Sequence, residues 1–417
     1  MDQIDDDTID TFISRGLTAE QISLELSSMY PNTKGFSKRS VERHLASRNI
    51  SRKNSVTDSE VDAAVASAVA AIGSQAGRRY VKGYIESIGG PKIDEHRIGL
   101  SLKKLDPLSH EARFHGVSRQ TNPQPYDAKY FGEKLHMDQN EKLIRYGVTV
   151  VAAMDGFSGM ITKTSTMTNK NNIVIYRDVL KPTIEDFGLF DQVVVDHRKE
   201  FCLTLAVQNS LKTFRGNQEM VPYKQIPSTK ARAVDHSCQP AGMVQNNRIE
   251  QFWVEYNGRI SFPIKQALVD MENSGRLDLS NQIHSFCCSK AVQSVVRIGL
   301  ERLVGSRNHH HVNGRGKPIE LAQMSRSVRL SLDVIPSVND AVTQYRAAGG
   351  SLTDPTEIGV DPLARSPEAY QQRNARLLKS GFDPGYIYGK TANLDYVDLQ
   401  NYIASFIRFT NELDNVV

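Results

Sequence analysis

The sequence lacks any apolar run long enough to cross a membrane. A membrane-spanning helix needs about 20 consecutive apolar residues, and no stretch of this 417-residue chain approaches that length. We also expect no secretory leader, because the sequence opens with the acidic stretch MDQIDDDTID instead of basic residues followed by an apolar segment. These absences predict an intracellular protein without a membrane partner.

Cysteine is scarce, with four in the whole sequence. The four show none of the paired spacings of a zinc site, and they are too few and too clustered for a secreted disulfide framework. They are Cys202, Cys238, Cys287 and Cys288. We therefore expect free thiols in a reducing compartment, and no cysteine-containing zinc module ahead of Cys202.

A strong excess of one charge sign is missing too. The formal net charge of +4 is too small to indicate a nucleic-acid partner by itself. Its distribution is uneven, because seven Lys or Arg lie between Lys34 and Lys53 against Glu42 alone. This segment is a candidate surface for phosphate contacts.

What is present first is a helical N-terminal segment. The chain is long enough for two or three domains, and apolar residues at helical spacing predict three short helices within residues 1–50. The third begins after Ser37, and its outward positions are polar or basic. This pattern is typical of a helix-turn-helix module whose last helix enters the major groove. The alternative is a small helical bundle with a solvated charged surface. The candidate DNA-binding residues are Lys38, Arg39, Ser40 and Arg43.

Two further segments follow. Residues 51–74 are rich in Ser and Ala and are interpreted as a linker or a loosely attached helix. Residues 75–125 contain apolar residues at helical spacing between Gly77 and Pro107 together with several Lys and Arg. We interpret them as a second helical DNA-binding module, again with a solvated helical bundle as the alternative.

From about residue 126 the pattern changes to alternating strands and helices. The runs LHMDQ, GVTVVAAMD and MITKTSTMT predict three strands, Asn171 to Phe187 a helix, and DQVVVDH a short buried strand. Helices are predicted at 199–214, 245–271 and near Tyr402 to Leu413, with another possible strand at 226–234. This order is that of a ribonuclease H-like α/β domain, expected over residues 126–330. Residues 331–417 receive no function from the sequence.

Three acidic residues fall where such a domain would bring them to one place. Asp138 lies in the first strand, Asp196 directly follows three valines, and Glu250 lies on the long helix. A carboxylate after a buried strand emerges at the strand end, because burying it unpaired is costly. Phosphodiester exchange requires two divalent ions about 3.5 to 4 Å apart, which a few carboxylates can hold. The alternative is that all three are surface charges.

Four blocks in this region resemble the core of a known family. They are LHMDQNEKLIRYGV, AAMDGFSG, VVVDHRKEF and QNNRIEQFW. In order and in residue type they resemble the DDE-type integrase core of retroviral integrases and related transposases, and most of all the integrase core proteins of eukaryotic transposable elements. The resemblance covers roughly residues 75 to 325. It implies an α/β ribonuclease H-like catalytic domain, with a mixed five-stranded sheet and flanking helices, preceded by all-α helix-turn-helix modules.

The resemblance also implies a site and a function. Asp138, Asp196 and Glu250 would be the catalytic residues and the ligands of two Mg²⁺ or Mn²⁺ ions, and Asn246 and Asn247 would lie near the DNA. The implied activity is metal-dependent hydrolysis of phosphodiesters and transfer of strands between element ends and target double-stranded DNA. A homo-oligomer on DNA, in the nucleus if the source is eukaryotic, is implied as well. Two alternatives remain open: a domesticated, catalytically silent DNA-binding protein, and a simple nuclease.

A few other residues allow two interpretations. Asp155 is either a site residue or the residue that forms the turn after its strand. His136, on the strand face of Asp138, either orients a ligand or is a packed histidine. The run from His309 to His311 is either a metal site or a solvated loop, and Trp253 is expected to pack the helix that carries Glu250.

The chain also departs from the family pattern at two places. His197 to Glu200 stand where many relatives have a glycine-rich turn. The separation of Asp196 from Glu250 is longer than usual, with an insertion expected between Phe214 and Ile226.

Overall fold

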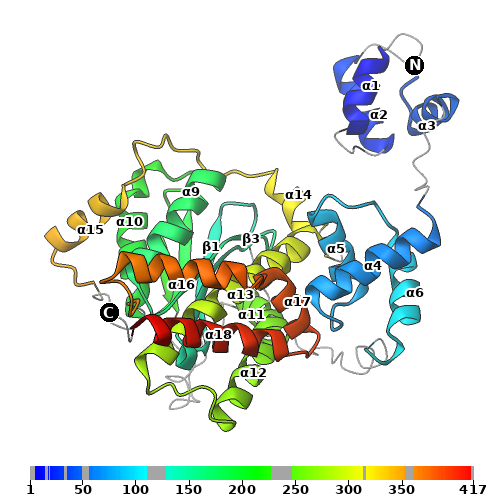
Figure 1. Cartoon of the computed structure of the whole chain (residues 1–417). Helices are drawn as coiled ribbons and strands as arrows, with labels where there is room; N and C mark the ends of the chain where they lie inside the picture. The colour runs from blue at the N-terminus through cyan, green and yellow to red at the C-terminus, as the bar shows by residue number, and fades with distance from the viewer. Residues whose placement is uncertain are drawn as a thin grey trace, which may run out of the picture. The chain divides into compact units, whose positions relative to one another are not determined.

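The computed structural model describes residues 5–14, 17, 19–31, 35–48, 56–109, 128–226, 247–312, 316–352 and 360–414. The chain divides into two compact units, Met1–Thr57 and Asp58–Val417. Figure 1 shows both. Each is described below by itself. In the ranges just given, no helix combines the length and the apolar character that a membrane span requires.

The first unit is a bundle of three short helices. They are α1 (Asp6–Ser14), α2 (Ala19–Met29) and α3 (Lys38–Ser47). Apolar side chains of all three form one core that includes Ile9, Ile22 and Val41. The Ser37 hydroxyl caps α3 by accepting the backbone N–H of Ser40 at 3.3 Å, which supplies one of the bonds that a helix start lacks. The helices predicted from the apolar spacing are therefore confirmed.

The second unit contains a mixed sheet of five strands in the order β3-β2-β1-β4-β5. The strands are β1 (Lys134–Leu143), β2 (Val148–Asp155), β3 (Ile161–Met167), β4 (Gln192–Asp196) and β5 (Tyr223–Ile226). β1 pairs antiparallel with β2 and parallel with β4, and β4 pairs parallel with β5. The predicted mixed five-stranded sheet is confirmed. The fifth strand begins before the predicted segment, of which residues 227–234 lie outside the described part.

Helices cover both faces of this sheet. As a result, β2 is buried along its whole length, and its side chains alternate between two apolar clusters, one on each face. Val151 and Ala153 face one cluster, which contains helical elements between β3 and β5. These are α8 (Asn172–Ile175), the π-helical turn η2 (Tyr176–Leu180), α9 (Lys181–Phe187), η3 (Lys199–Phe201) and α10 (Cys202–Ser210). The short turn η4 (Lys212–Phe214) follows α10. Two more elements of the chain are α14 (Pro318–Ala322) and α15 (Val338–Ala347), of which α15 packs against α10.

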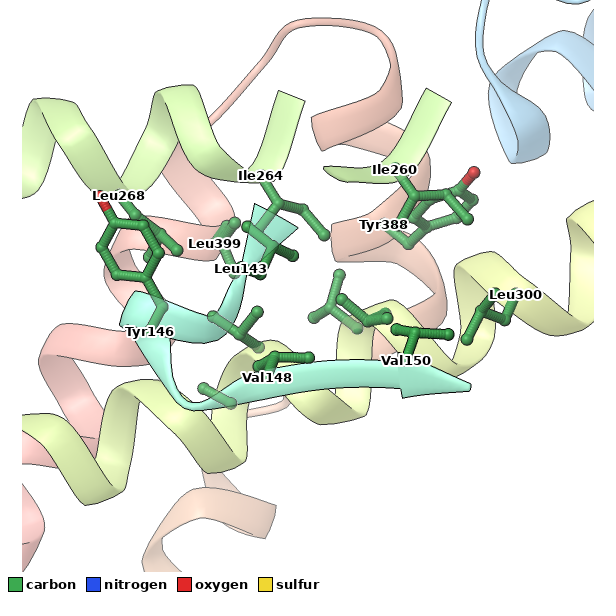
Figure 2. Close-up of a cluster of buried hydrophobic side chains, with 14 of the residues drawn as sticks. Leu143, Tyr146, Val148, Val150, Ile260, Ile264, Leu268, Leu300, Tyr388 and Leu399 are labelled. Atoms are coloured by element: carbon green, nitrogen blue, oxygen red, sulfur yellow. The ribbon is translucent and has the colours of Figure 1, made fainter. Parts of the chain in front are cut away.

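Val148 and Val150 face the opposite cluster. Figure 2 shows them directed toward Ile264 and the other apolar side chains of this cluster. The elements that build it include η1 (Ile144–Tyr146), α11 (Asn247–Tyr256), the π-helical turn η6 (Asn257–Ser261), α12 (Phe262–Asn273) and α13 (Gln282–His309). The predicted long helix at 245–271 is thus observed from Asn247 to Asn273, with one π-helical turn inside it.

The C-terminal helices complete this second cluster. They are α16 (Pro367–Lys379), α17 (Pro384–Ala392) and α18 (Val397–Asp414). α17 and α18 both contact α13, and α16 contacts α18, as Figure 1 shows in orange and red. Leu399, Ile403 and Phe406 of α18 belong to the same buried cluster as Val148. The C-terminal segment, to which the sequence analysis assigns no function, therefore helps to bury the core.

Three helices that precede the sheet also belong to the second unit. They are α4 (Asp58–Ile72), α5 (Arg78–Ser87) and α6 (Glu95–Leu105). α4 packs on α17, and α5 packs on α13. The approach of α5 to α13 is so close that a Cβ atom on Gly83 would overlap the carbonyl oxygen of Ser306. The segment interpreted as a linker or loosely attached helix thus contains the packed helix α4.

Candidate active site

The strand register places two of the three predicted carboxylates next to each other. Parallel pairing of β1 with β4 joins Lys134 to Gln192 and His136 to Val194. Continuing this register by two residues sets Asp138 beside Asp196, on strands about 4.8 Å apart. Asp138 also pairs with Ala152, which belongs to the cluster of α11 to α13. Both carboxylates therefore lie on the sheet face that these helices cover.

The electrostatic state of Asp138 reflects this neighbourhood. Burial and, to a smaller extent, the adjacent Asp196 carboxylate raise the pKa of Asp138 to about 7, against the opposing effects of a Gln139 backbone bond, Trp253 and Arg198. A like charge nearby and loss of solvent both disfavour the ionised form. A cation between the two carboxylates would remove this penalty. The donor set fits a hard divalent ion, which takes carboxylate oxygens.

Glu250 lies in the first turn of α11 and is exposed. Trp253, one turn further along the same helix, donates its indole N–H to Asp138 Oδ2 at 2.8 Å. Residues three apart lie on the same helix face. In the part of the chain that the structure describes, no three His, Cys, Asp or Glu side chains form a group able to hold a metal ion. The structure thus brings Asp138 and Asp196 together and places Glu250 on a helix bonded to Asp138.

A second polar contact fixes the same helix to β1. Asn140, two residues beyond Asp138 on the same strand face, donates to Asn257 Oδ1 at 3.0 Å. Asn257 begins the π-helical turn η6, and such turns often mark functional segments of a helix. Two hydrogen bonds, at Trp253 and at Asn257, therefore set the position of α11 relative to the strand of Asp138.

Sequence reasoning anticipated only part of the role of Trp253. It packs as predicted, because it is buried and its ring centroid lies 5.1 Å from Phe252 and 5.6 Å from Tyr256. Its hydrogen bond to Asp138 was missed. Two features of the sequence could have predicted this bond. Trp253 lies three residues after Glu250, on the same helix face, and a buried indole N–H usually has a polar partner.

A network of four charged residues borders the carboxylate pair. Lys170 Nζ lies 2.8 Å from Glu141 Oε1 and 3.1 Å from Glu200 Oε1. Arg198 pairs with Glu141, and its charge also acts on Asp138. Arg198 and Glu200 belong to the segment that departs from the glycine-rich turn of relatives. Sequence reasoning noted that departure without assigning these residues to the site.

Asp155 lies away from the pair and forms a turn. Its carboxylate accepts the backbone N–H and the hydroxyl of Ser158 at 2.6 and 2.7 Å, and the N–H of Gly132 at 3.1 Å. Asp155 pairs with Leu135, which belongs to the cluster on the opposite sheet face. Of its two interpretations, the structure supports the turn-forming residue.

The histidine candidates differ in their surroundings. His136 is fully buried on the strand face of Asp138. His309 and His310 contact carbonyl oxygens of the preceding helical turn, Gly305 at 2.8 Å and Arg307 at 2.6 Å. His310 also stacks on Tyr80. Both are thus engaged at the end of α13, and the described residues offer no metal group there.

The candidate DNA-binding residues lie mainly on α3. Lys38, Arg39 and Arg43 are exposed and Ser40 is half-buried. Lys38 is 3.6 Å from Glu20, whereas Arg39 and Arg43 have no ion pair among the described residues of this unit. Asn246 lies outside the described residues, and Asn247 begins α11.

Many basic residues of the second helical segment have acidic partners within their own unit. Arg78 and Arg79 pair with Glu95. Arg97 pairs with Asp58, and Lys104 pairs with Asp62. Part of the positive charge that led to the interpretation of residues 75–125 as a DNA-binding module is therefore neutralised.

A mixed sheet in this strand order, covered by helices on both faces and carrying paired carboxylates on neighbouring strands, defines a ribonuclease H-like fold. Residues 126–324 match the family model of the integrase core domain. This match supports a DDE-type integrase core in that part of the chain. Core domains of this family usually use divalent metals. No curated protein matches the sequence.

Proposed function

We propose that this protein is a metal-dependent integrase or transposase that hydrolyses phosphodiesters and joins strand ends to target double-stranded DNA. The observation that carries the proposal is the proximity of Asp138 and Asp196 on adjacent strands of an integrase core domain, as the strand register and the effect of Asp196 on the pKa of Asp138 indicate. Asp138, Asp196 and Glu250 are the proposed ligands of two Mg²⁺ or Mn²⁺ ions. Bound ions would supply activation of an oxygen nucleophile and neutralisation of the leaving oxygen.

The protein's own residues have distinct proposed tasks. Asp138 and Asp196 provide anionic oxygens on a rigid sheet, which keeps them in place without a partner ion. Trp253 and Asn257 hold α11 against β1, so that Glu250 stays within one helical turn of the Asp138 contact. Asn246 and Asn247 precede Glu250 and are proposed to contact DNA.

The test is a strand-transfer assay with the full chain. Supercoiled plasmid and a short DNA duplex with free 3′-hydroxyl ends are incubated with Mg²⁺ or Mn²⁺. Nicked plasmid and covalently joined products are expected for the natural chain and for Asp178→Asn, a carboxylate on η2 that pairs with Arg177. Neither product is expected for Asp138→Asn or Asp196→Asn. Joining that persists in Asp138→Asn would refute the proposal, and nicking without joining would favour a nuclease.

A second candidate function is a domesticated, catalytically silent DNA-binding protein. The observation in its favour is that the described residues contain no assembled group of three metal-ligating side chains. Such a protein would bind DNA with an affinity that falls steeply as salt rises, yet would give no nicked plasmid with either ion. A homo-oligomer on DNA is proposed under both functions, and sedimentation with and without duplex DNA measures it.

A further inference from the structure

The indole of Trp253 connects the Glu250 helix directly to the carboxylate pair. Its N–H lies 2.8 Å from Asp138 Oδ2. The ring is buried, and it packs against the rings of Phe252 and Tyr256 of the same helix. An N–H donor fixed in this way has little freedom to leave the carboxylate.

This bond restricts the carboxylate itself. A free carboxylate exchanges its two oxygens by rotation about the bond to Cβ, so its direction toward an ion is undefined. When a rigid donor occupies Oδ2, the plane of the carboxylate and the direction of Oδ1 become fixed. Outer partners of metal ligands commonly orient them in this manner, and their loss typically costs 10- to 100-fold in metal affinity or activity.

The same bond also restricts α11. Trp253 lies one turn from Glu250, and Asn257 anchors the helix one further turn along through Asn140. With two contacts to one strand, the helix cannot slide along β1 without breaking a hydrogen bond. A single side chain therefore links the orientation of Asp138 with the position of Glu250.

We propose that Trp253 is a positioning residue, whose indole N–H orients the Asp138 carboxylate for a divalent cation and holds the helix of Glu250 in register with it. This inference rests on the proposed assignment of Asp138 as a metal ligand. It deepens that assignment by naming the side chain that prepares the ligand.

The sequence offers a direct reporter, because Trp253 is its only tryptophan. Fluorescence emission of the full chain, titrated with MgCl₂ or MnCl₂, follows the indole that contacts Asp138. We expect a saturable change whose midpoint equals the dissociation constant from calorimetry. Neither the change nor the calorimetric signal is expected in Asp138→Asn.

The matched variants are Trp253→Phe, which removes the N–H and keeps an aromatic ring, and Tyr256→Phe, which alters the neighbouring buried ring of α11. Calorimetry is expected to give a dissociation constant for Mg²⁺ roughly 10-fold higher in Trp253→Phe and unchanged in Tyr256→Phe. Circular dichroism melts identify variants that do not fold. If Trp253→Phe fails to fold, the fluorescence titration of the natural chain decides alone.

Two results would overturn the inference and leave the proposed metal site intact. One is a natural Mg²⁺ affinity in folded Trp253→Phe while Asp138→Asn has lost binding. The other is a fluorescence signal that stays constant through the ion concentrations at which calorimetry shows saturation. Equal ion binding by Asp138→Asn and the natural chain would instead refute the proposed site, and the inference with it.

Discussion

At the residue scale, the carboxylate pair that the proposed function requires lowers the stability of the metal-free fold. Asp138 and Asp196 are adjacent like charges, and burial and mutual repulsion together raise the pKa of Asp138 to about 7. Such a pair costs folding free energy that only a bound cation returns. Acidic residues at a surface would carry no comparable cost, so the penalty itself distinguishes the pair from ordinary surface charge.

Replacing Asp138 by Asn should therefore stabilise the metal-free protein. In EDTA at neutral pH we expect the free energy of unfolding to rise by about 1 kcal/mol, because one of two repelling charges disappears. Addition of Mg²⁺ should stabilise the natural chain through ligand linkage and leave Asp138→Asn unchanged. Urea unfolding with and without Mg²⁺ measures both effects. A variant that is less stable than the natural chain in EDTA would contradict the prediction.

Asp155 gives a prediction about pH. Burial raises its pKa from 3.8 to about 6, although hydrogen bonds from Ser158 and Gly132 oppose the shift. The pKa of Asp155 is therefore higher in the folded than in the unfolded protein. The protonated carboxyl contributes its full stabilisation below pH 3.8, and this contribution is lost as the pH rises through about 6. The stability advantage of the natural chain over Asp155→Asn should thus shrink by about 2 kcal/mol across that window. Urea unfolding of both proteins in buffers from roughly pH 4 to 7 measures this change. A difference in unfolding free energy that stays constant with pH would refute the prediction.

At the element scale, the close contact between α5 and α13 depends on a missing side chain. Gly83 of α5 faces the Ser306 carbonyl of α13, and the Ser306 hydroxyl donates back to the Tyr80 carbonyl at 2.7 Å. Two backbones can approach in this way only where one residue lacks Cβ. This contact joins a helix that precedes the sheet to the longest helix of the core.

The change Gly83→Ala should separate these helices. We expect a loss of about 1 to 3 kcal/mol in the free energy of unfolding, because the added methyl group overlaps backbone that has no room to shift. Gly258 in η6 is the matched control, since a Cβ there meets nothing within 4 Å. Gly258→Ala should gain about 0.5 to 1 kcal/mol from helix propensity. Urea unfolding of both variants tests the pair, and equal effects would contradict the packing argument.

Sequence patterns predicted most elements because their signals are local. The β-rich runs of β1 and β2, the valines before Asp196 and the helical spacing of residues 247–273 each depend on neighbours in the chain. The bond from Trp253 to Asp138 joins residues 115 positions apart, and no local pattern specifies it. The neutralisation of Arg97 by Asp58 is likewise a consequence of tertiary packing, so a count of basic residues overstated the free charge of its segment.

At the scale of the whole molecule, the two units suit different tasks. The second unit holds the carboxylate pair inside a large core that the C-terminal helices complete. The first is small, and its helix α3 presents exposed Arg39 and Arg43. Phosphate contacts need exposed cations without acidic partners. Arg39 and Arg43 meet this condition among the described residues of their unit. Arg97 does not, because it pairs with Asp58.

Loss of Arg39 and Arg43 should therefore weaken DNA binding without affecting the metal site. Binding of a fluorescent duplex to Arg39→Ala/Arg43→Ala is followed by anisotropy between roughly 50 and 200 mM salt. Each lost phosphate contact should reduce the slope of log affinity against log salt by about 0.9, or about 1.8 for both.

The control is Arg97→Ala, which removes a cation already paired with Asp58 and should keep the natural slope. Asp138→Asn should keep it as well, since its carboxylate lies in the other unit. The double variant should in turn keep the natural Mg²⁺ affinity, because neither arginine belongs to the core. An unchanged salt slope in the double variant would assign DNA binding to another surface, and the helix-turn-helix interpretation of α3 would then be wrong.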